Sequence, residues 1–147
     1  VRELYSPVTR ADQRDGRGRL LFLSDPETCC RLNKELPLEP VLAAHDVWIS
    51  GVRAEQSAQR SRLEQECPGP RGVLRYHPLL HWTRDDMAAY REQYELPVHP
   101  LDTTGCASIG CAPCTHLEAA SDGRNGRWHG LRRTECGLHT RLAGARP

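Results

Sequence analysis

The sequence has very little lysine, methionine or phenylalanine, and its apolar residues never form a long run. Lys34 is the only lysine among 20 basic residues, a ratio that indicates a genome biased towards arginine codons. The longest apolar runs, such as Leu20–Leu23, are four residues long, so the sequence predicts no transmembrane helix. The first residues carry mixed charge and no apolar stretch follows them, so no secretory signal peptide is predicted.

An excess of charge of one sign is also missing. The formal net charge is +1, which argues against binding to nucleic acid or to a membrane surface by electrostatic attraction. With 38% hydrophobic and 27% charged residues, the chain is too apolar and too balanced in charge for simple disorder. Its 147 residues suit one domain. Because the chain has no initiator methionine and opens within a charged segment, we expect a fragment of a longer protein.

Local signals predict short helices and strands. Asp25 followed by Pro26 is typical of a helix start, and Thr83 with Asp86 resembles a capping box. The pattern predicts loops at 1–19 and from 122 onwards, strands at 47–50 and 73–76, and helices from 26 to near 37, over 40–46, from 84 to before Pro97, and from near Cys111 to Ser121.

Seven cysteines without a secretory signal favour metal binding or catalysis over disulfides, and an odd number cannot all pair. Cys111 and Cys114 form a CxxC pair, which is typical of a zinc knuckle, a redox dithiol or half an iron–sulfur site. Cys29 and Cys30 are adjacent, whereas structural zinc sites space their cysteines by two to four residues. An iron–sulfur cluster, a zinc site and unrelated buried thiols all remain open from spacing alone.

Cys136 stands apart from these pairs. Arg132 and Arg133 precede it, and nearby cations lower the pKa of a thiol. With Gly137 beside it, this cysteine is predicted to be a mobile nucleophile in a flexible tail, and an ordinary exposed cysteine is the alternative. Cys67 and Cys106 have no obvious partner and are interpreted as structural thiols.

Taken together, several segments in order resemble the assimilatory sulfonucleotide reductases, the family of adenylyl-sulfate (APS) and phosphoadenylyl-sulfate (PAPS) reductases. The resemblance runs from about Leu21 to about Thr140. The resembling segments are Cys29-Cys30 with Lys34 and Pro37-Leu38, Trp48–Arg53 with Gln56, Ser57 and Arg60, His77–Leu79 with Trp82, Leu96-Pro97 with His99–Leu101, Ser108–Thr115, Arg124–Trp128 and Glu135–His139.

The resemblance implies an α/β fold of the adenine-nucleotide alpha-hydrolase type, a parallel sheet flanked by helices, of which this chain would be the C-terminal portion. Residues 1–121 would form the cluster-binding part of that α/β domain, and residues 122–147 a flexible tail with the catalytic cysteine. It also implies a [4Fe–4S] cluster held by Cys29, Cys30, Cys111 and Cys114. Cys136 would be the nucleophile, and the implied substrate-binding residues are Lys34, Arg53, Arg124, Arg127 and His139. Guanidinium groups suit the phosphate and sulfate of such a substrate.

The implied activity is thioredoxin-dependent reduction of APS to sulfite and AMP through an S-sulfocysteine, in sulfate assimilation and cysteine biosynthesis. The alternatives are a cluster-bearing PAPS reductase and a non-catalytic iron–sulfur or zinc module. The implied partners are thioredoxin, or a similar dithiol, and a small sulfonucleotide. We expect a cytoplasmic protein that binds neither nucleic acid nor membrane, and homo-oligomerisation stays open.

Overall fold

The computed structural model describes residues 1–101, 108–115, 127 and 135–140, except for the side chains of His139 and Thr140. Two compact units divide the chain. The first comprises Val1–Ile49, Glu66–Tyr76 and Glu135–Pro147, and the second comprises Ser50–Gln65 and His77–Thr134. The domain boundary expected between 121 and 122 falls outside the described residues and stays a prediction.

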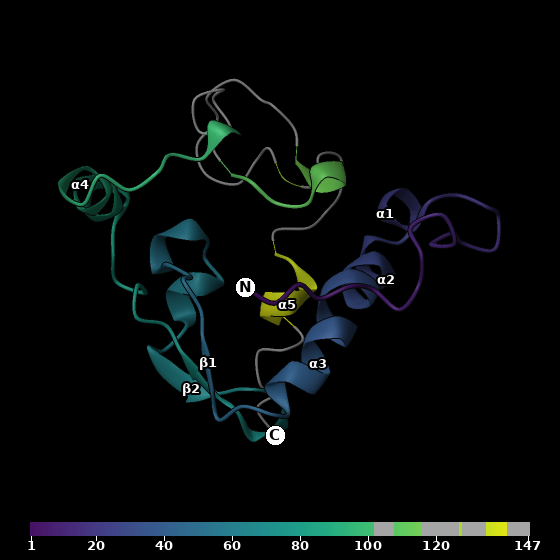
Figure 1. Cartoon of the computed structure of the whole chain (residues 1–147), viewed down its shortest axis with the longest axis horizontal. Coiled ribbons are helices and arrows are strands. Elements are labelled where there is room, and N and C mark those ends of the chain that lie inside the picture. Colours follow the sequence, from purple (N-terminus) through teal and green to yellow (C-terminus); the bar gives the residue numbers. More distant parts are fainter. Residues whose placement is uncertain (102–107, 116–126, 128–134, 141–147) are drawn as a thin grey trace. The chain divides into compact units, whose positions relative to one another are not determined.

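One helical run in the first unit carries the vicinal cysteines (Figure 1). It consists of α1 (Leu21–Ser24), α2 (Pro26–Cys30), the π-helical segment η1 (Arg31–Glu35) and α3 (Leu36–Leu42). Asp25 caps α2 as predicted, because its carboxylate accepts a hydrogen bond from the backbone N–H of Thr28 at 3.0 Å. Pro26 occupies the first turn, where a missing N–H costs no helical hydrogen bond.

The helical run continues past Pro37, where the sequence analysis wrongly expected it to end. Pro37 lies in the first turn of α3, a position that tolerates proline. The π-helical turn just before it has a different hydrogen-bond register, so α3 starts as a new helix. The second helix expected at 40–46 is therefore part of α3, which ends at Leu42.

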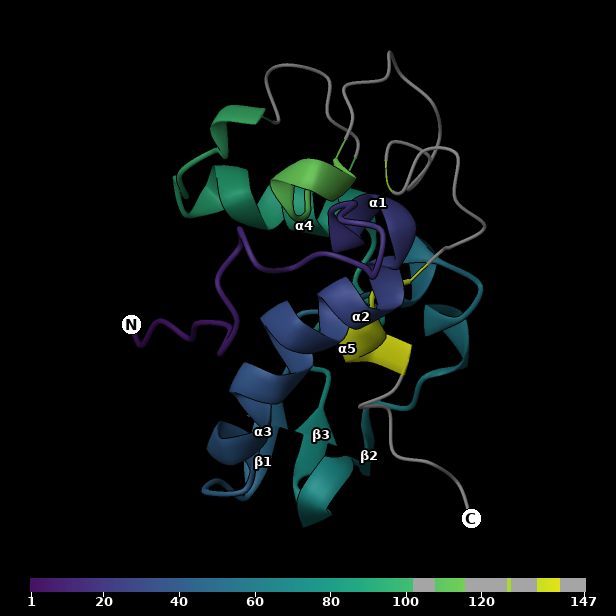
Figure 2. The ribbon, with the colours of Figure 1, turned by 90° about the vertical axis from the view of Figure 1, so that its right-hand side faces the viewer.

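Three short strands form one mixed sheet in the first unit, in the order β1-β3-β2 (Figure 2). β1 (Val47–Ile49) pairs in parallel with β3 (Leu74–Tyr76), and β2 (Glu66–Pro68) pairs antiparallel with β3. A single 3₁₀ turn, η4 (Pro70–Gly72), joins β2 to β3. The α/β class and both predicted strands are confirmed. β2 was not predicted, because a strand that contains Pro68 carries little local strand signal and is tolerated at a sheet edge.

The core of the first unit lies between this sheet and the helices. Leu42 and Val73 are buried, and Leu38, Trp48 and Leu138 pack against them. Leu138 belongs to α5 (Gly137–Thr140), so the C-terminal part of the chain contributes to this core. Strand side chains alternate between faces, and the opposite face of the sheet exposes the apolar side chains of Val47, Ile49 and Leu74.

The second unit contains η2 (Ala54–Gln56), η3 (Arg60–Arg62), α4 (Arg84–Gln93) and η6 (Ala112–Cys114). The predicted capping box starts α4: Thr83 Oγ1 accepts from the backbone N–H of Asp86 at 3.1 Å, and Asp86 Oδ2 accepts from the N–H of Thr83 at 2.7 Å. Tyr90 follows on the predicted helix, and its ring centroid lies 5.3 Å from that of Trp82.

The helix expected from Cys111 to Ser121 is not formed over its first residues. Ala112–Cys114 make only a single 3₁₀ turn. Thr115 is extended and forms an antiparallel β-bridge with Arg127. The backbone of Thr115 therefore pairs with a residue distant in sequence and does not continue a helix. Residues 116–121 lie outside the described part. Among the described residues, no helix has the length and apolar character that spanning a membrane requires.

Candidate functional site

Cys136 is buried in the first unit, directly before α5, with an exposed fraction of 6%. The ammonium Nζ of Lys34 donates a hydrogen bond to its Sγ at 3.1 Å, across 102 positions of sequence. In Figures 1 and 2, α5 accordingly lies beside α2 and α3, the helices that flank η1. The nucleophile and the substrate-binding lysine, which the sequence analysis assigned separately, are therefore in direct contact.

The position of Lys34 follows from the π-helical segment that starts directly after the vicinal cysteines. Arg31–Glu35 form this segment, and such wide turns occur often at functional sites. Lys34 follows Cys30 by four positions, so both side chains lie on the same side of the helical run. The only lysine of the sequence is thus directed at the candidate nucleophile.

The surroundings lower the pKa of Cys136 from its ordinary value of 9.0 to about 5. The largest cause is a hydrogen bond between the thiols of Cys136 and Cys30, whose Sγ atoms lie 4.0 Å apart. Burial opposes this effect, whereas the charge of Lys34 and a backbone hydrogen bond from Leu138 reinforce it. Cys136 is therefore a thiolate at neutral pH, which is the nucleophilic form. Arg132 and Arg133, to which the sequence analysis attributed the activation, lie outside the described residues.

Glu35 is a member of this site that the sequence analysis missed. Its carboxylate is buried, and a Cβ atom added to Gly137 would collide with its Oε1 and lie 3.6 Å from the Cβ of Cys30. Gly137 therefore lets the backbone of the tail approach η1 closely. The missed signal was the spacing: Glu35 follows Cys30 by five positions, the hydrogen-bond spacing of a π-helix, and the sequence was analysed at the α-helical period.

Cys29 lies at the end of α2 and is half-buried. The side-chain amide of Asn33 donates to its backbone carbonyl at 2.8 Å and to its Sγ at 3.5 Å. Asn33 also exchanges two hydrogen bonds with Gln13, at 2.7 and 3.0 Å, and Gln13 is buried. These contacts fasten the N-terminal loop to the helical segment beside the cysteine pair, which the sequence analysis did not foresee.

Cys111 and Cys114 belong to the second unit, at the start and end of the turn that contains η6. The N–H of Cys114 donates to the carbonyl of Cys111 at 2.8 Å, and Cys114 is buried. Arg127, a predicted substrate-binding residue, is also buried and donates to the carbonyls of Cys114 at 3.2 Å and of Ile109 at 3.0 Å. A Cβ on Gly110 would collide with its guanidinium, so this glycine makes room for an arginine that fixes the CxxC turn.

The chemistry of the cysteine pairs fits a cluster ligated by four thiolates. None of the six described cysteines belongs to a disulfide, and the pairs offer the soft donors that iron–sulfur clusters take. The pairs lie in different units, and each is described by itself. Within the part of the chain that the structure describes, no three His, Cys, Asp or Glu side chains gather into a metal-binding group. The four-cysteine site therefore rests on donor chemistry alone.

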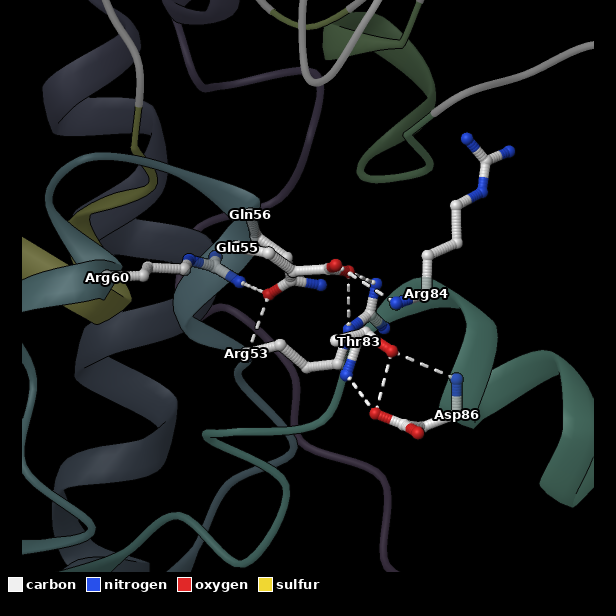
Figure 3. Close-up of polar contacts among 7 residues, drawn as sticks. All are labelled: Arg53, Glu55, Gln56, Arg60, Thr83, Arg84 and Asp86. Atoms are coloured by element: carbon white, nitrogen blue, oxygen red, sulfur yellow. Dashed lines mark hydrogen bonds and ion pairs between the residues drawn. The ribbon is translucent and has the colours of Figure 1, made fainter.

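Arg53, another predicted substrate-binding residue, is held by carboxylate and amide partners of the second unit (Figure 3). Its Nη2 forms an ion pair with Glu55 Oε1 at 2.7 Å, and its backbone N–H donates to Gln56 Oε1 at 3.1 Å. Glu55 Oε2 accepts from the N–H of Arg84 at 2.9 Å, and the hydrogen bond from Arg53 lowers the pKa of Glu55. Arg124 and the side chain of His139 lie outside the described residues.

A helix-covered sheet with a parallel strand pair, joined to a buried and activated cysteine, defines an α/β domain suited to thiol chemistry. The comparison with known families shows to which family this α/β domain belongs. The chain belongs to the phosphoadenosine phosphosulfate reductase domain family, which it matches over residues 5–117. This confirms the resemblance to sulfonucleotide reductases seen in the sequence.

Individual relatives are reductases of APS by name. The chain is 40% identical over 134 residues to an adenosine 5'-phosphosulfate reductase of Bacillus pumilus and 42% identical over 135 residues to one of Oceanobacillus iheyensis. It is 39% identical over 134 residues to adenosine 5'-phosphosulfate reductase 1 of Bacillus subtilis. Each match covers 90% of this chain but only 58%, 56% and 58% of the respective relative, so the chain spans a little over half of their length.

Proposed function

We propose that this chain carries the nucleophile of an APS reductase. The observation that supports the proposal most strongly is the contact between Lys34 and Cys136 at 3.1 Å, because an ammonium beside a buried thiol favours the thiolate form that attack on sulfur requires. The family membership and the names of the relatives supply the substrate class.

The proposed reaction has two covalent steps. The thiolate of Cys136 attacks the sulfur of APS, a sulfur–sulfur bond forms, the sulfur–oxygen bond to the phosphate breaks, and AMP leaves with the electron pair. A dithiol protein such as thioredoxin then attacks Sγ of Cys136 and releases sulfite, and its second thiol frees Cys136. The dithiol is oxidised to a disulfide, and its two electrons account for the reduction of sulfate to sulfite.

The basic residues have distinct proposed roles. Lys34 holds the thiolate of Cys136 and offers an ammonium to the incoming sulfate group. Arg53, Arg124, Arg127 and His139 are proposed to bind the nucleotide. For Arg53 this requires the anionic substrate to compete with Glu55. Arg127 already donates two hydrogen bonds to backbone carbonyls, so its proposed contribution is to shape the CxxC turn beside the substrate.

We also propose that Cys29, Cys30, Cys111 and Cys114 hold a [4Fe–4S] cluster, because these two pairs of cysteines, which form no disulfide, supply its four ligands. Cys30 would ligate the cluster as a thiolate without a proton, so its hydrogen bond with Cys136 belongs to the metal-free chain, and in the cluster-bearing protein the ammonium of Lys34 would be the group that stabilises the Cys136 thiolate. A cluster-bearing PAPS reductase is the second candidate, since the family description names that substrate. The printed names of the relatives favour APS. A cytoplasmic location and the oligomeric state stay predictions.

The decisive experiment is to incubate the intact protein with APS in the absence of reductant and map its cysteine peptides by mass spectrometry. We expect a gain of about 80 Da, one SO₃ group, on Cys136 alone. Added thioredoxin should remove it and release sulfite. Cys136→Ser should abolish the adduct, and the matched control Cys67→Ser should keep it. An adduct on another cysteine would overturn the proposal, and a faster reaction with PAPS than with APS would support the second candidate.

The cluster needs its own measurement. Anaerobically purified protein should be brown and contain about four irons per chain. Cys29→Ser or Cys111→Ser should lose iron, whereas Cys136→Ser should retain it. Colourless protein with one bound zinc would contradict the cluster while leaving the role of Cys136 open to the adduct experiment.

A further inference from the structure

Arg75 is a buried cation without hydrogen-bond acceptors. It lies in the middle of β3, the central strand, and its side chain is 0% exposed. Among the described residues, none accepts a hydrogen bond from its Nε, Nη1 or Nη2. Burial without an acceptor is unfavourable for so polar a group, because the hydrogen bonds to water are lost and nothing replaces them.

The position of this guanidinium is well fixed. Its Cζ lies 4.6 Å from the centre of the Trp48 ring, a stacking contact that covers one face and leaves the N–H groups at the edge without acceptors. A Cβ atom added to Gly69 would lie 2.8 Å from Cγ of Arg75, so the backbone at Gly69 lies close against the stem of this side chain. The Arg75 side chain is therefore held in place, and its N–H groups could donate hydrogen bonds to an anion placed at the edge of the guanidinium.

Cys67 is the residue directly opposite Arg75. The two are Cα partners in the antiparallel pairing of β2 with β3, so their side chains share one face of the sheet. The two groups also interact electrostatically: burial lowers the pKa of Arg75, and a charge on Cys67 raises it. Cys67 is a free, half-buried thiol on an edge strand, which leaves it within reach of small reagents.

We propose that Cys67 is an oxidation site whose sulfinate form is bound by Arg75. A hydroperoxide first transfers an oxygen atom to the thiol, giving a sulfenic acid, while its own O–O bond breaks and it is reduced to an alcohol or water. A second hydroperoxide repeats this step, and the resulting sulfinic acid releases its proton. Each step oxidises the sulfur by two electrons. The two sulfinate oxygens then accept hydrogen bonds from the edge of the guanidinium, as a carboxylate does.

This assignment differs from the role proposed for Cys136. Cys136 has an ammonium partner and a buried hydrogen-bond network in the reduced state, so it suits attack on a substrate. Cys67 faces a guanidinium whose acceptors are missing until the sulfur gains oxygen. Oxidation of Cys67 should therefore make the first unit more stable, whereas oxidation of an ordinary core thiol introduces a polar group without a partner.

Aspartate has the shape and charge of a cysteine sulfinate, which allows a test without oxidant. Cys67→Asp should melt about 3–6 °C higher than Cys67→Asn, its neutral match, because the carboxylate supplies the acceptors that Arg75 lacks. In an Arg75→Met background the order should reverse. A Cys67→Asp variant that melts at or below Cys67→Asn in the presence of Arg75 would overturn the proposal, and this comparison does not depend on whether Arg75→Met folds.

The chemistry is tested on the intact chain with hydrogen peroxide and peptide mapping. The Cys67 peptide should gain about 32 Da, two oxygen atoms, and the modified wild type should melt higher than the untreated protein. The sulfinate yield after a fixed, short exposure should fall at least about fivefold in Arg75→Met, because no guanidinium then stabilises the negative charge that develops on the oxidised sulfur and the reaction is slower. Formation of a disulfide at Cys67, or equal yields with and without Arg75, would also overturn the proposal.

Discussion

Replacing Lys34 by methionine removes the ammonium from the Cys136 thiolate and keeps the length of the side chain. A hydrogen bond to a charged group contributes about 1.5–3 kcal/mol. Because about 1.36 kcal/mol corresponds to one pKa unit, the substitution should raise the pKa of Cys136 by about 1–2 from its value of about 5. In the metal-free protein the hydrogen bond with Cys30, the largest cause of the low pKa, is retained, so the pKa should stay below the ordinary 9.0.

The rate of alkylation of Cys136 by iodoacetamide measures this change. At pH 6 the thiolate fraction falls from about 90% in the wild type to about 10–50% in Lys34→Met, so the rate should fall about 2- to 10-fold. At pH 8.5 both proteins are thiolates and the rates should agree. The ratio of the two rates within one protein cancels differences in access to the buried sulfur.

Arg31→Met is the matched control, because Arg31 belongs to the same π-helical segment, is exposed, and also loses one positive charge. Its rate ratio should equal that of the wild type. If Lys34→Met and Arg31→Met show the same ratio, general charge rather than the 3.1 Å contact sets the reactivity of Cys136, and the reasoning fails.

Three further predictions concern stability and are checked by urea denaturation. The pKa of Cys136 in the folded chain, about 5, lies below its ordinary 9.0, so its thiolate contributes stability that is complete above pH 9 and is lost as the pH falls towards 5. The wild type should lose more stability than Cys136→Ser across that window, and equal losses would contradict the low pKa. Gly69→Ala should cost about 1–3 kcal/mol, because its Cβ would lie 2.8 Å from the carbonyl oxygen of Val73. Gly16→Ala, which meets nothing within 4 Å, should change the free energy of unfolding by less than about 0.5 kcal/mol, and a similar cost for both would refute the clash. Thr83→Ala should cost about 0.5–2 kcal/mol through the lost cap of α4, and Thr83→Ser should recover most of it; no recovery would exclude the hydroxyl as the cause.

Features with a local physical cause were predictable from the sequence. The caps at Asp25 and Thr83 depend on residues three positions apart, so the sequence contains the whole signal. The β-branched residues of β1 likewise identify their strand. Features that depend on distant partners were not predictable in the same way. β2 is a strand because β3 pairs with it, and Thr115 leaves the helical path because it pairs with Arg127.

The candidate site shows the same division. The motif resemblance singled out Cys136 and Lys34, but their contact joins residues 102 positions apart, which neither spacing nor periodicity reveals. Glu35 escaped notice because the π-helical register places it beside Gly137, a position that an α-helical count does not give. The buried state of Arg75 also follows from the sheet and not from its neighbours in sequence.

The contribution of Leu138 to the core has a consequence for how the chain folds during synthesis. Its partners Leu42 and Val73 leave the ribosome long before it does, and closing so long a loop costs entropy that grows slowly with loop length. Contacts between such distant positions also slow folding. A nascent chain that ends before Glu135 has α3 and the sheet but no α5 against them. The last part of the first unit to assemble is then the segment that carries Cys136. An interrupted translation product therefore lacks the candidate nucleophile.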